Sequence, residues 1–125
     1  MPWFIEYNDA LDCVVHTFTG RHTGKDIRNA TTSGMAAGKL HKTHKYLIDL
    51  RKLEYAGSIS RLMDLPTVQY REEGLSRQSR IAIVLPESQK AKQDAMFYET
   101  ICVNRGWNVK CFSSRVDALN WLQCH

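Results

Sequence analysis

The chain has 125 residues, of which 43% are hydrophobic and 24% are charged, and its formal net charge is +4. This length and composition are typical of an ordinary folded protein and not of a disordered one, so we expect residues 1–125 to form a single domain. No apolar run is long enough to span a membrane and no secretion signal stands at the N-terminus, so we expect a cytoplasmic protein without membrane insertion. The basic residues are too scattered to predict a nucleic-acid partner.

The first predicted elements form a β-hairpin followed by a helix. Residues 3–7 and 13–18 are β-prone runs, and Asn8 and Asp9 form a turn between them. A helix is predicted from Thr23 to about Leu40, although Gly34 and Gly38 disfavour it. Its buried face is predicted to carry Ile27, Ala30 and the group Met35, Ala36 and Ala37.

The stretch GRHTGKD, residues 20–26, is similar to the end of a phosphate-binding loop. Such a loop has four residues before its Gly-Lys pair and a hydroxyl residue after it, whereas here three residues intervene and Asp26 follows Lys25. Thr23 and Asp26 instead have the spacing of a capping box, in which each side chain bonds the backbone of the other. We therefore interpret this stretch as the start of a helix and expect no nucleotide.

The middle of the chain is predicted to add two strands and a helix. Residues 46–50 form an apolar run typical of a strand covered on both faces. Residues 58–74 are predicted to be helical, with a kink or a break at Pro66. Residues 80–85, RIAIVL, form the clearest strand of the sequence, which Pro86 ends.

The last third is predicted to contain a helix at residues 89–105, a strand at 109–112 and a terminal helix capped by Ser114. The first of these helices pairs Phe97 with Ile101 and Tyr98 with Cys102 at a spacing of four residues; in the second, Val116, Leu119 and Leu122 are predicted to face inward. Because strands alternate with helices after the hairpin, the order predicts an α/β fold whose sheet has a parallel centre.

Histidine and cysteine spacing does not predict a metal site or a cofactor. His41 and His44 would share one face of a helix, but no third ligand is near in sequence and lysines surround them, so a solvated turn is favoured. The cysteines, Cys13, Cys102, Cys111 and Cys124, contain no Cys-x-x-Cys pair, and we expect them to be reduced.

Two segments resemble the STAS domain, the fold of bacterial anti-anti-sigma factors. Phe18-Thr19-Gly20 is similar to the family's Thr-Gly-Glu-Leu-Asp before the first helix. Residues 49–60, DLRKLEYAGSIS, align without a gap with the family's Asp-Leu-Ser-x-Val-x-Phe-Met-Asp-Ser-Ser-Gly. The resemblance covers nearly the whole chain and is closest to the divergent SpoIIAA-like group related to Sec14-type lipid-binding domains. It implies a mixed sheet of about five strands, with a parallel centre and an N-terminal hairpin, covered by about four helices.

The resemblance also implies a site directly after the third strand. Ser58 stands at the serine that a partner kinase phosphorylates in anti-anti-sigma factors. The acidic residue usual before it is Gly57 here, and Ser60 replaces the closing glycine. We name Gly57, Ile59, Ser60 and Arg61 as candidates for the interaction surface around Ser58. The local alternative is that Ser58 is the N-cap of the second helix.

A second candidate site lies in the segment that follows. Residues 62–80 mix apolar side chains with arginines, and the alternatives are a helix that covers the sheet, a wall of a pocket for an apolar anion, or a face that pairs with a second copy. The candidate pocket residues are Leu62, Leu65, Tyr70 and Arg71.

Three functions follow from these features. The first is a non-enzymatic regulatory module that binds a protein partner, or a second copy as a homodimer, near the end of the third strand. The second is a small carrier of an apolar or lipid-like ligand. The third is a hydrolase whose site the sequence does not reveal, since no nucleophile motif is present.

Overall fold

The computed structural model describes residues 3–55 and 65–123. In this part of the chain five strands form one sheet in the order β1-β2-β3-β4-β5. β1 and β2 are antiparallel, and each later strand is parallel to the strand before it. The predicted mixed sheet with an N-terminal hairpin and a parallel centre is confirmed. The strands are β1 (Trp3–Asn8), β2 (Cys13–His22), β3 (Lys45–Tyr55), β4 (Arg80–Val84) and β5 (Asn108–Phe112).

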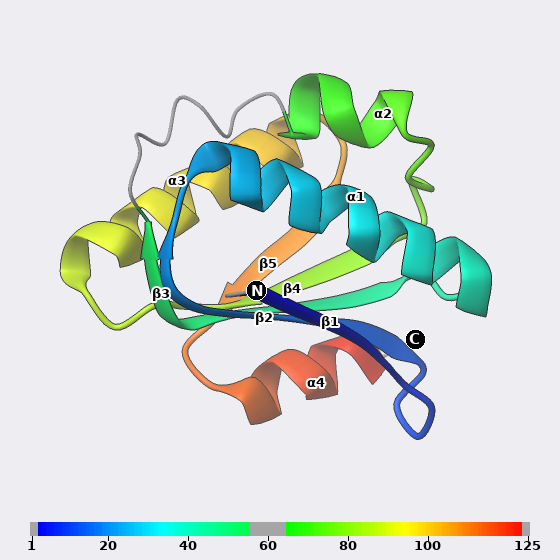
Figure 1. Ribbon diagram of the computed structural model, residues 1–125, viewed down its shortest axis with the longest axis horizontal. Helices are drawn as coiled ribbons and strands as arrows, with labels where there is room; N and C mark the ends of the chain where they lie inside the picture. Colours follow the sequence, from blue (N-terminus) through cyan, green and yellow to red (C-terminus); the bar gives the residue numbers. More distant parts are fainter. Residues whose placement is uncertain (1–2, 56–64, 124–125) are drawn as a thin grey trace.

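Helices cover both faces of this sheet (Figure 1). They are α1 (Gly24–His41), a π-helical turn η2 (Leu65–Gln69), α2 (Tyr70–Glu72), α3 (Gln89–Asn104) and α4 (Arg115–Gln123). Figure 1 shows α1, α2 and α3 on one face and α4 alone on the other. The helices that connect parallel strands thus share one face, and the predicted α/β architecture is confirmed.

The core has two parts, one on each face of the sheet. Side chains alternate along a strand, so Val14 packs under α1 while Val15 packs against α4. The part under α1 and α3 contains the larger side chains, among them Phe18, Tyr46, Tyr70, Tyr98 and Trp107. The part under α4 is smaller: Cys13, Val15, Leu47, Ala82, Val84, Ala118 and Leu122.

The α1 helix confirms the capping box and resolves the difficulty with its glycines. The Thr23 amide donates to Asp26 at 2.9 Å, and the Asp26 amide donates to the Thr23 hydroxyl at 3.3 Å. A Cβ atom at Gly34 would overlap the His16 ring, and one at Gly38 would overlap the Tyr46 hydroxyl. Both glycines therefore let large side chains of the sheet approach the helix backbone, which sequence propensity alone does not reveal.

Two parts of the sequence prediction differ from the structure. Val116 was predicted to face inward, but it is 67% exposed, because the short α4 contacts the sheet through Ala118 and Leu122. In the predicted helix at 58–74, residues 58–64 lie outside the described part; of the rest, Leu65–Gln69 is π-helical and only Tyr70–Glu72 is α-helical. Pro66 cannot donate a backbone hydrogen bond, which disfavours a regular α-helix there.

The predicted helix pairs and cysteines are placed as follows. Tyr98 and Cys102 are buried with Ala95 on one face of α3, whereas Phe97, one residue away, is 51% exposed. Cys13 and Cys102 are buried and Cys111 is half-buried, and all three are free thiols. Cys124 lies outside the described residues.

Candidate functional site

The predicted contact site begins where β3 ends, at Tyr55. Gly57, Ser58, Ile59, Ser60 and Arg61 follow directly in the chain and lie outside the described residues. What the structure describes is the framework in front of them, the carboxyl ends of β2 and β3. Both strands are longer than predicted and pair as far as His22 and Tyr55. The added residues include Gly20, Lys52 and Glu54, which strands disfavour, so backbone pairing and not local propensity extends these strands.

A β-bulge shapes this framework. Thr17 pairs with Asp49, and the next registered pair is Thr19 with Lys52, so β3 uses three residues where β2 uses two. Leu50 and Leu53 consequently line the same cavity although they are three residues apart, a spacing that would place them on opposite faces of a regular strand. The bulge therefore reorients the last residues of β3.

On the α4 side of the bulge, Asp49 forms a buried ion cluster that fixes the start of α4 to β3. Its side chain is 6% exposed and accepts hydrogen bonds from Arg51 at 2.7 Å and from Arg115 at 3.2 Å. Burial alone would raise the pKa of Asp49, but hydrogen bonds and charge from Arg51, together with Arg115, lower this pKa below its ordinary value. Asp49 is thus a charged structural anchor between β3 and the start of α4.

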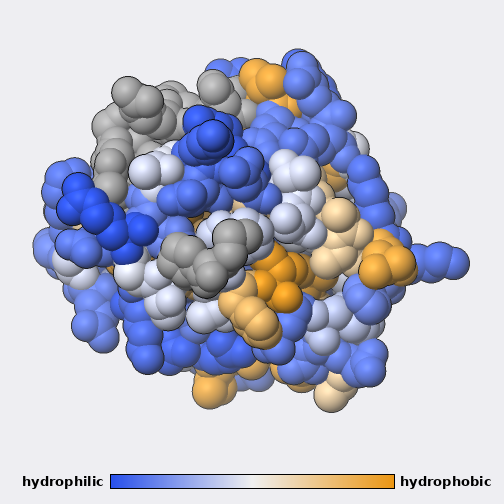
Figure 2. Space-filling model, in the orientation of Figure 1, coloured by the Kyte–Doolittle hydropathy of each residue, from blue (hydrophilic) through white to orange (hydrophobic). Residues whose placement is uncertain are grey.

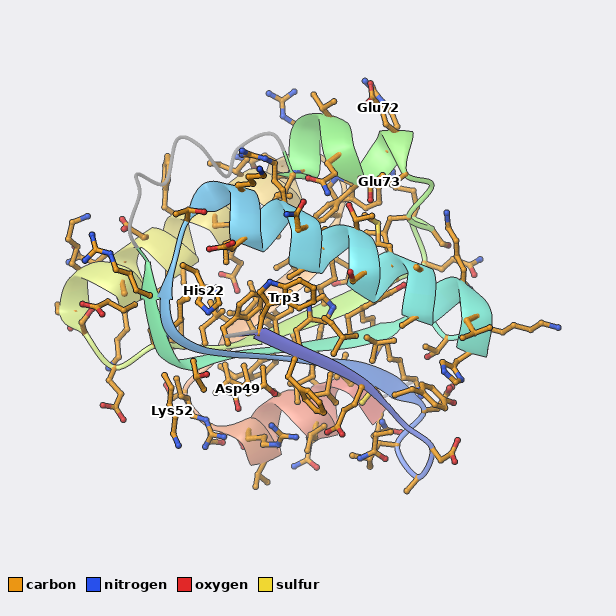
Figure 3. The ribbon with its side chains drawn as sticks, in the orientation of Figure 1. Trp3, His22, Asp49, Lys52, Glu72 and Glu73 are labelled. Carbon is orange, nitrogen blue, oxygen red and sulfur yellow. The ribbon has the colours of Figure 1, made fainter. Side chains whose placement is uncertain are left out.

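Three exposed cations stand near the carboxyl ends of β2 and β3 and at the start of α1. Arg21 near the end of β2, Lys25 in the first turn of α1 and Lys52 near the end of β3 are all exposed. Figure 3 shows Lys52 on the α4 side of the sheet, near Asp49. Two acids lie among them: Glu54, which pairs with Arg21 across the two strands, is exposed, and the Asp26 side chain, next to Lys25 in the chain, is 39% exposed. The ends of β2 and β3 therefore present a surface suited to an acidic partner.

The second predicted site is a cavity of about 100 Å³ between the sheet, α1 and α3. Leu65 and Tyr70 line it, as do Leu50 and Leu53. Arg71 is exposed and does not line the cavity, and Leu62 lies outside the described residues. Sites for drug-sized ligands span about 300–1,000 Å³. The cavity is therefore small for a whole lipid.

Sequence reasoning named Tyr70 in this cavity but missed its other polar groups, among them His16 and Tyr98. His16 lines it and is 5% exposed, and burial lowers the pKa of its ring to about 4. The hydroxyls of Tyr70 and Tyr98 are hydrogen-bonded to each other at 2.5 Å. Strand alternation could have found His16, because it stands midway between Val14 and Phe18, which both face this side.

The two histidines considered as metal ligands have separate surroundings. The ring of His41, at the end of α1, stacks on Tyr7 with 4.0 Å between ring centroids. His44 instead lines a different cavity near the end of α1. Across residues 3–55 and 65–123, no three His, Cys, Asp or Glu side chains are grouped so that they could hold a metal ion. Within the same ranges, no helix has the length and apolar content needed to cross a membrane.

Two solved structures resemble this chain along nearly its whole length. One is an uncharacterized protein of the DUF3478 family with a SpoIIAA-like fold from Shewanella loihica PV-4, with a TM-score of 0.59 and 19% identity over 96% of this chain and 91% of that chain. The fold is SpoIIAA-like. The other is the anti-sigma factor antagonist SpoIIAA in its unphosphorylated form, with a TM-score of 0.56 and 13% identity over 98% of this chain and 99% of that chain.

The sequence itself matches no protein-family model and no curated protein. The SpoIIAA-like likeness therefore lies in the architecture, and it confirms the fold that the resemblance to STAS domains implied. At 13% and 19% identity it shows the fold alone.

Proposed function

We propose that this SpoIIAA-like chain is a non-enzymatic regulatory module, acting as one domain, that binds a protein partner at the carboxyl ends of β2 and β3. The observation that carries the proposal is the likeness to SpoIIAA, an anti-sigma factor antagonist, over 98% of the chain. The likeness extends over β3, whose end at Tyr55 stands three residues before Ser58. The contact surface comprises Arg21 and Lys52 with the segment from Gly57 to Arg61.

The charge of this surface supports an acidic partner. Arg21, Lys25 and Lys52 are exposed there, and Glu54 and the partly exposed Asp26 offset part of this charge. Charge complementarity of this kind mainly raises the rate and the specificity of association. The ion cluster at Asp49 holds the end of β3 and the start of α4 together, so the basic side chains lie on a fixed framework.

Phosphorylation of Ser58 is the proposed control of this contact. A phosphoserine carries a charge of about −1.5 to −2 near neutral pH. That charge would reduce the attraction for an acidic partner and repel its carboxylates. The modified form would therefore bind the partner more weakly than the unmodified form.

The other two functions receive less support. A cavity of about 100 Å³ does not favour a lipid carrier. For a hydrolase, His16 is a poor general base, because its ring is buried against the Gly34 backbone and its pKa is lowered to about 4. The protein partner is alternatively a second copy of the chain. Figure 2 shows apolar surface over β1, where Phe4 is 59% exposed.

Site-specific photocrosslinking in cells tests the proposal. A benzophenone amino acid replaces Lys52 in one variant and Lys110, an exposed lysine of β5, in a matched control. We expect one discrete protein adduct from position 52 and none from position 110. A second set of variants carries the crosslinker at position 21. In this background, Lys52→Glu and Ser58→Asp should each lower the yield of the same adduct, whereas Lys110→Glu should not.

Equal adducts at positions 52 and 110, or no adduct at either, would contradict a partner surface at the ends of β2 and β3. An adduct between two copies of the chain would identify the partner as a second copy, in a homodimer. Ser58 is tested separately by mass spectrometry of the chain purified from its native cells. If the contact forms but Ser58 is never phosphorylated, the interaction stands and its control by phosphate is wrong.

A further inference from the structure

A second cavity lies near the carboxyl end of α1, away from the ends of β2 and β3. Its volume is about 290 Å³, close to the lower bound of about 300 Å³ for small-molecule sites. The end of α1, the loop into β3, and the loop between α2 and β4 form its walls. Its lining residues are Met35, Gly38, Lys39, Lys42, Thr43, His44, Tyr46, Gly74, Leu75, Ser76 and Ser79.

The rim of this cavity is cationic. Lys39 and Lys42 are exposed side chains of the lining, and the lining contains no aspartate or glutamate. Two acids adjoin the lining: Glu73 precedes Gly74, and Asp12, whose carbonyl accepts a hydrogen bond from the Thr43 hydroxyl, has its carboxylate hydrogen-bonded by the Tyr7 hydroxyl. The Glu73 carboxylate accepts hydrogen bonds from Thr32 and Gln69, and Lys39 bonds to the Glu73 carbonyl at 2.6 Å. Figure 3 shows Glu73 on the side of α2 that faces α1 and Glu72 on the opposite side.

A buried hydroxyl without a partner lies in the wall of the same cavity. Ser79 is 2% exposed, and its Oγ atom has no hydrogen-bond partner among the described residues. Its backbone amide is held by the Ser76 carbonyl at 3.0 Å, which fixes the residue in place. Burying a hydroxyl without a hydrogen bond is unfavourable, so an acceptor from a ligand would relieve this cost.

The remaining lining gives the cavity an apolar floor. Met35, Tyr46 and Leu75 are buried members of the core that reach it. The Tyr46 hydroxyl fills the space beside Gly38, and Gly74 has a φ of +81°, a conformation that few residues other than glycine adopt. Thr43 and Ser76 add further hydroxyls to the lining, so the wall is polar above this apolar floor. Cations on the rim, an unpartnered hydroxyl at Ser79 and an apolar floor together match a compact molecule with an anionic end.

We propose that this cavity binds a small organic oxyanion, a carboxylate or phosphate on a compact apolar body. Lys39 and Lys42 attract the anionic group, the Ser79 hydroxyl donates a hydrogen bond to one of its oxygens, and the apolar body rests on Met35, Tyr46 and Leu75. This site is independent of the partner surface at the ends of β2 and β3. The stretch between His41 and Lys45 supplies Lys42, Thr43 and His44 to the lining.

The two lysines also compensate the negative end of the α1 dipole, so the test must separate binding from helix stability. Phenyl phosphate and benzoate probe the two anion types, and phenol is the neutral probe of the same shape. Binding to the full chain is followed by amide NMR shifts and by the midpoint of thermal unfolding. We expect at least one anion to bind, with shifts at Gly38–Thr43 and Gly74–Ser79, and phenol to cause none.

Two variants and one matched control decide the outcome. Ser79→Ala should weaken binding of the anion about tenfold while leaving the unfolding midpoint unchanged or higher, because the lost hydroxyl had no partner. Lys42→Gln should also weaken binding, whereas Lys25→Gln, which removes one charge from the other end of α1, should leave it within about twofold. Failure of both anions to bind, binding of phenol as tight as that of the anions, or equal affinities in wild type and Ser79→Ala would overturn the proposal.

Discussion

The His16 ring lies directly against the backbone of α1 at Gly34. A Cβ atom at position 34 would overlap the ring, and the ring is 5% exposed. The Nε2 atom of His16 is buried without a hydrogen-bond partner among the described residues. The helix and the strand therefore share one close contact in which a glycine makes room for a neutral imidazole.

Gly34→Ala should destabilise the chain even though alanine is the better helix former. Alanine gains about 1 kcal/mol in helix propensity, but forcing a methyl group into this packed contact costs about 1–3 kcal/mol or more. We expect a net loss, measured as a lower free energy of unfolding in urea. Ser33→Ala, on an exposed position of the same helix, should be neutral or stabilising. If the double variant His16→Ala with Gly34→Ala shows no coupling, the contact is not the cause.

Stability should fall in mild acid because of His16. Burial lowers the pKa of His16 from 6.5 to about 4, so between these values the unfolded chain binds a proton that the folded chain does not. This stability is fully present above about pH 6.5 and is lost as the pH falls toward 4, on the order of 3 kcal/mol. Urea titrations at several pH values measure it. His16→Leu should remove this component and His41→Gln should keep it; a pH profile unchanged in His16→Leu would refute the assignment.

Asp49→Asn should loosen the attachment of α4 to the sheet. The variant keeps the shape of the side chain but removes the charge that Arg51 and Arg115 bind. Because both arginines are partly exposed, we expect a loss of about 1–3 kcal/mol, less than for a fully buried pair. Hydrogen exchange should increase in α4. Asp94→Asn, which removes the exposed pair with Lys90, is the control and should cost less than about 0.5 kcal/mol.

Thr23→Ala should destabilise α1 by about 1 kcal/mol, since it removes the Thr23 hydroxyl that accepts a hydrogen bond from the Asp26 amide. Thr23→Ser should restore most of this loss, because serine supplies the same hydroxyl. The measurement is again the free energy of unfolding in urea. Mg-ATP should not shift the unfolding midpoint of the wild type. A midpoint that rises with Mg-ATP and no longer rises in Thr23→Ala would contradict capping as the role of residues 20–26.

Local rules predicted most of the elements of this fold. The capping box at Thr23, the apolar run before Pro86 and the Ser114 cap each act over a few residues, so they can be read from the sequence. The extension of β2 and β3 could not, because His22 and Tyr55 are paired only by strands that the chain brings together. Val116 was misplaced for a similar reason: a short helix has several apolar faces, and the contact with the sheet selects one.

The sequence by itself determined the alternation of strands and helices, and hence the SpoIIAA-like layering, since periodicity and capping depend on neighbours along the chain. Tertiary structure alone decided the two features that now carry the functional proposals. The ends of β2 and β3 present basic side chains together because parallel strands end at the same edge. Lys42 and Ser79 meet at one cavity although 37 positions separate them in the sequence. Contacts between distant residues depend on packing, and no local pattern encodes them.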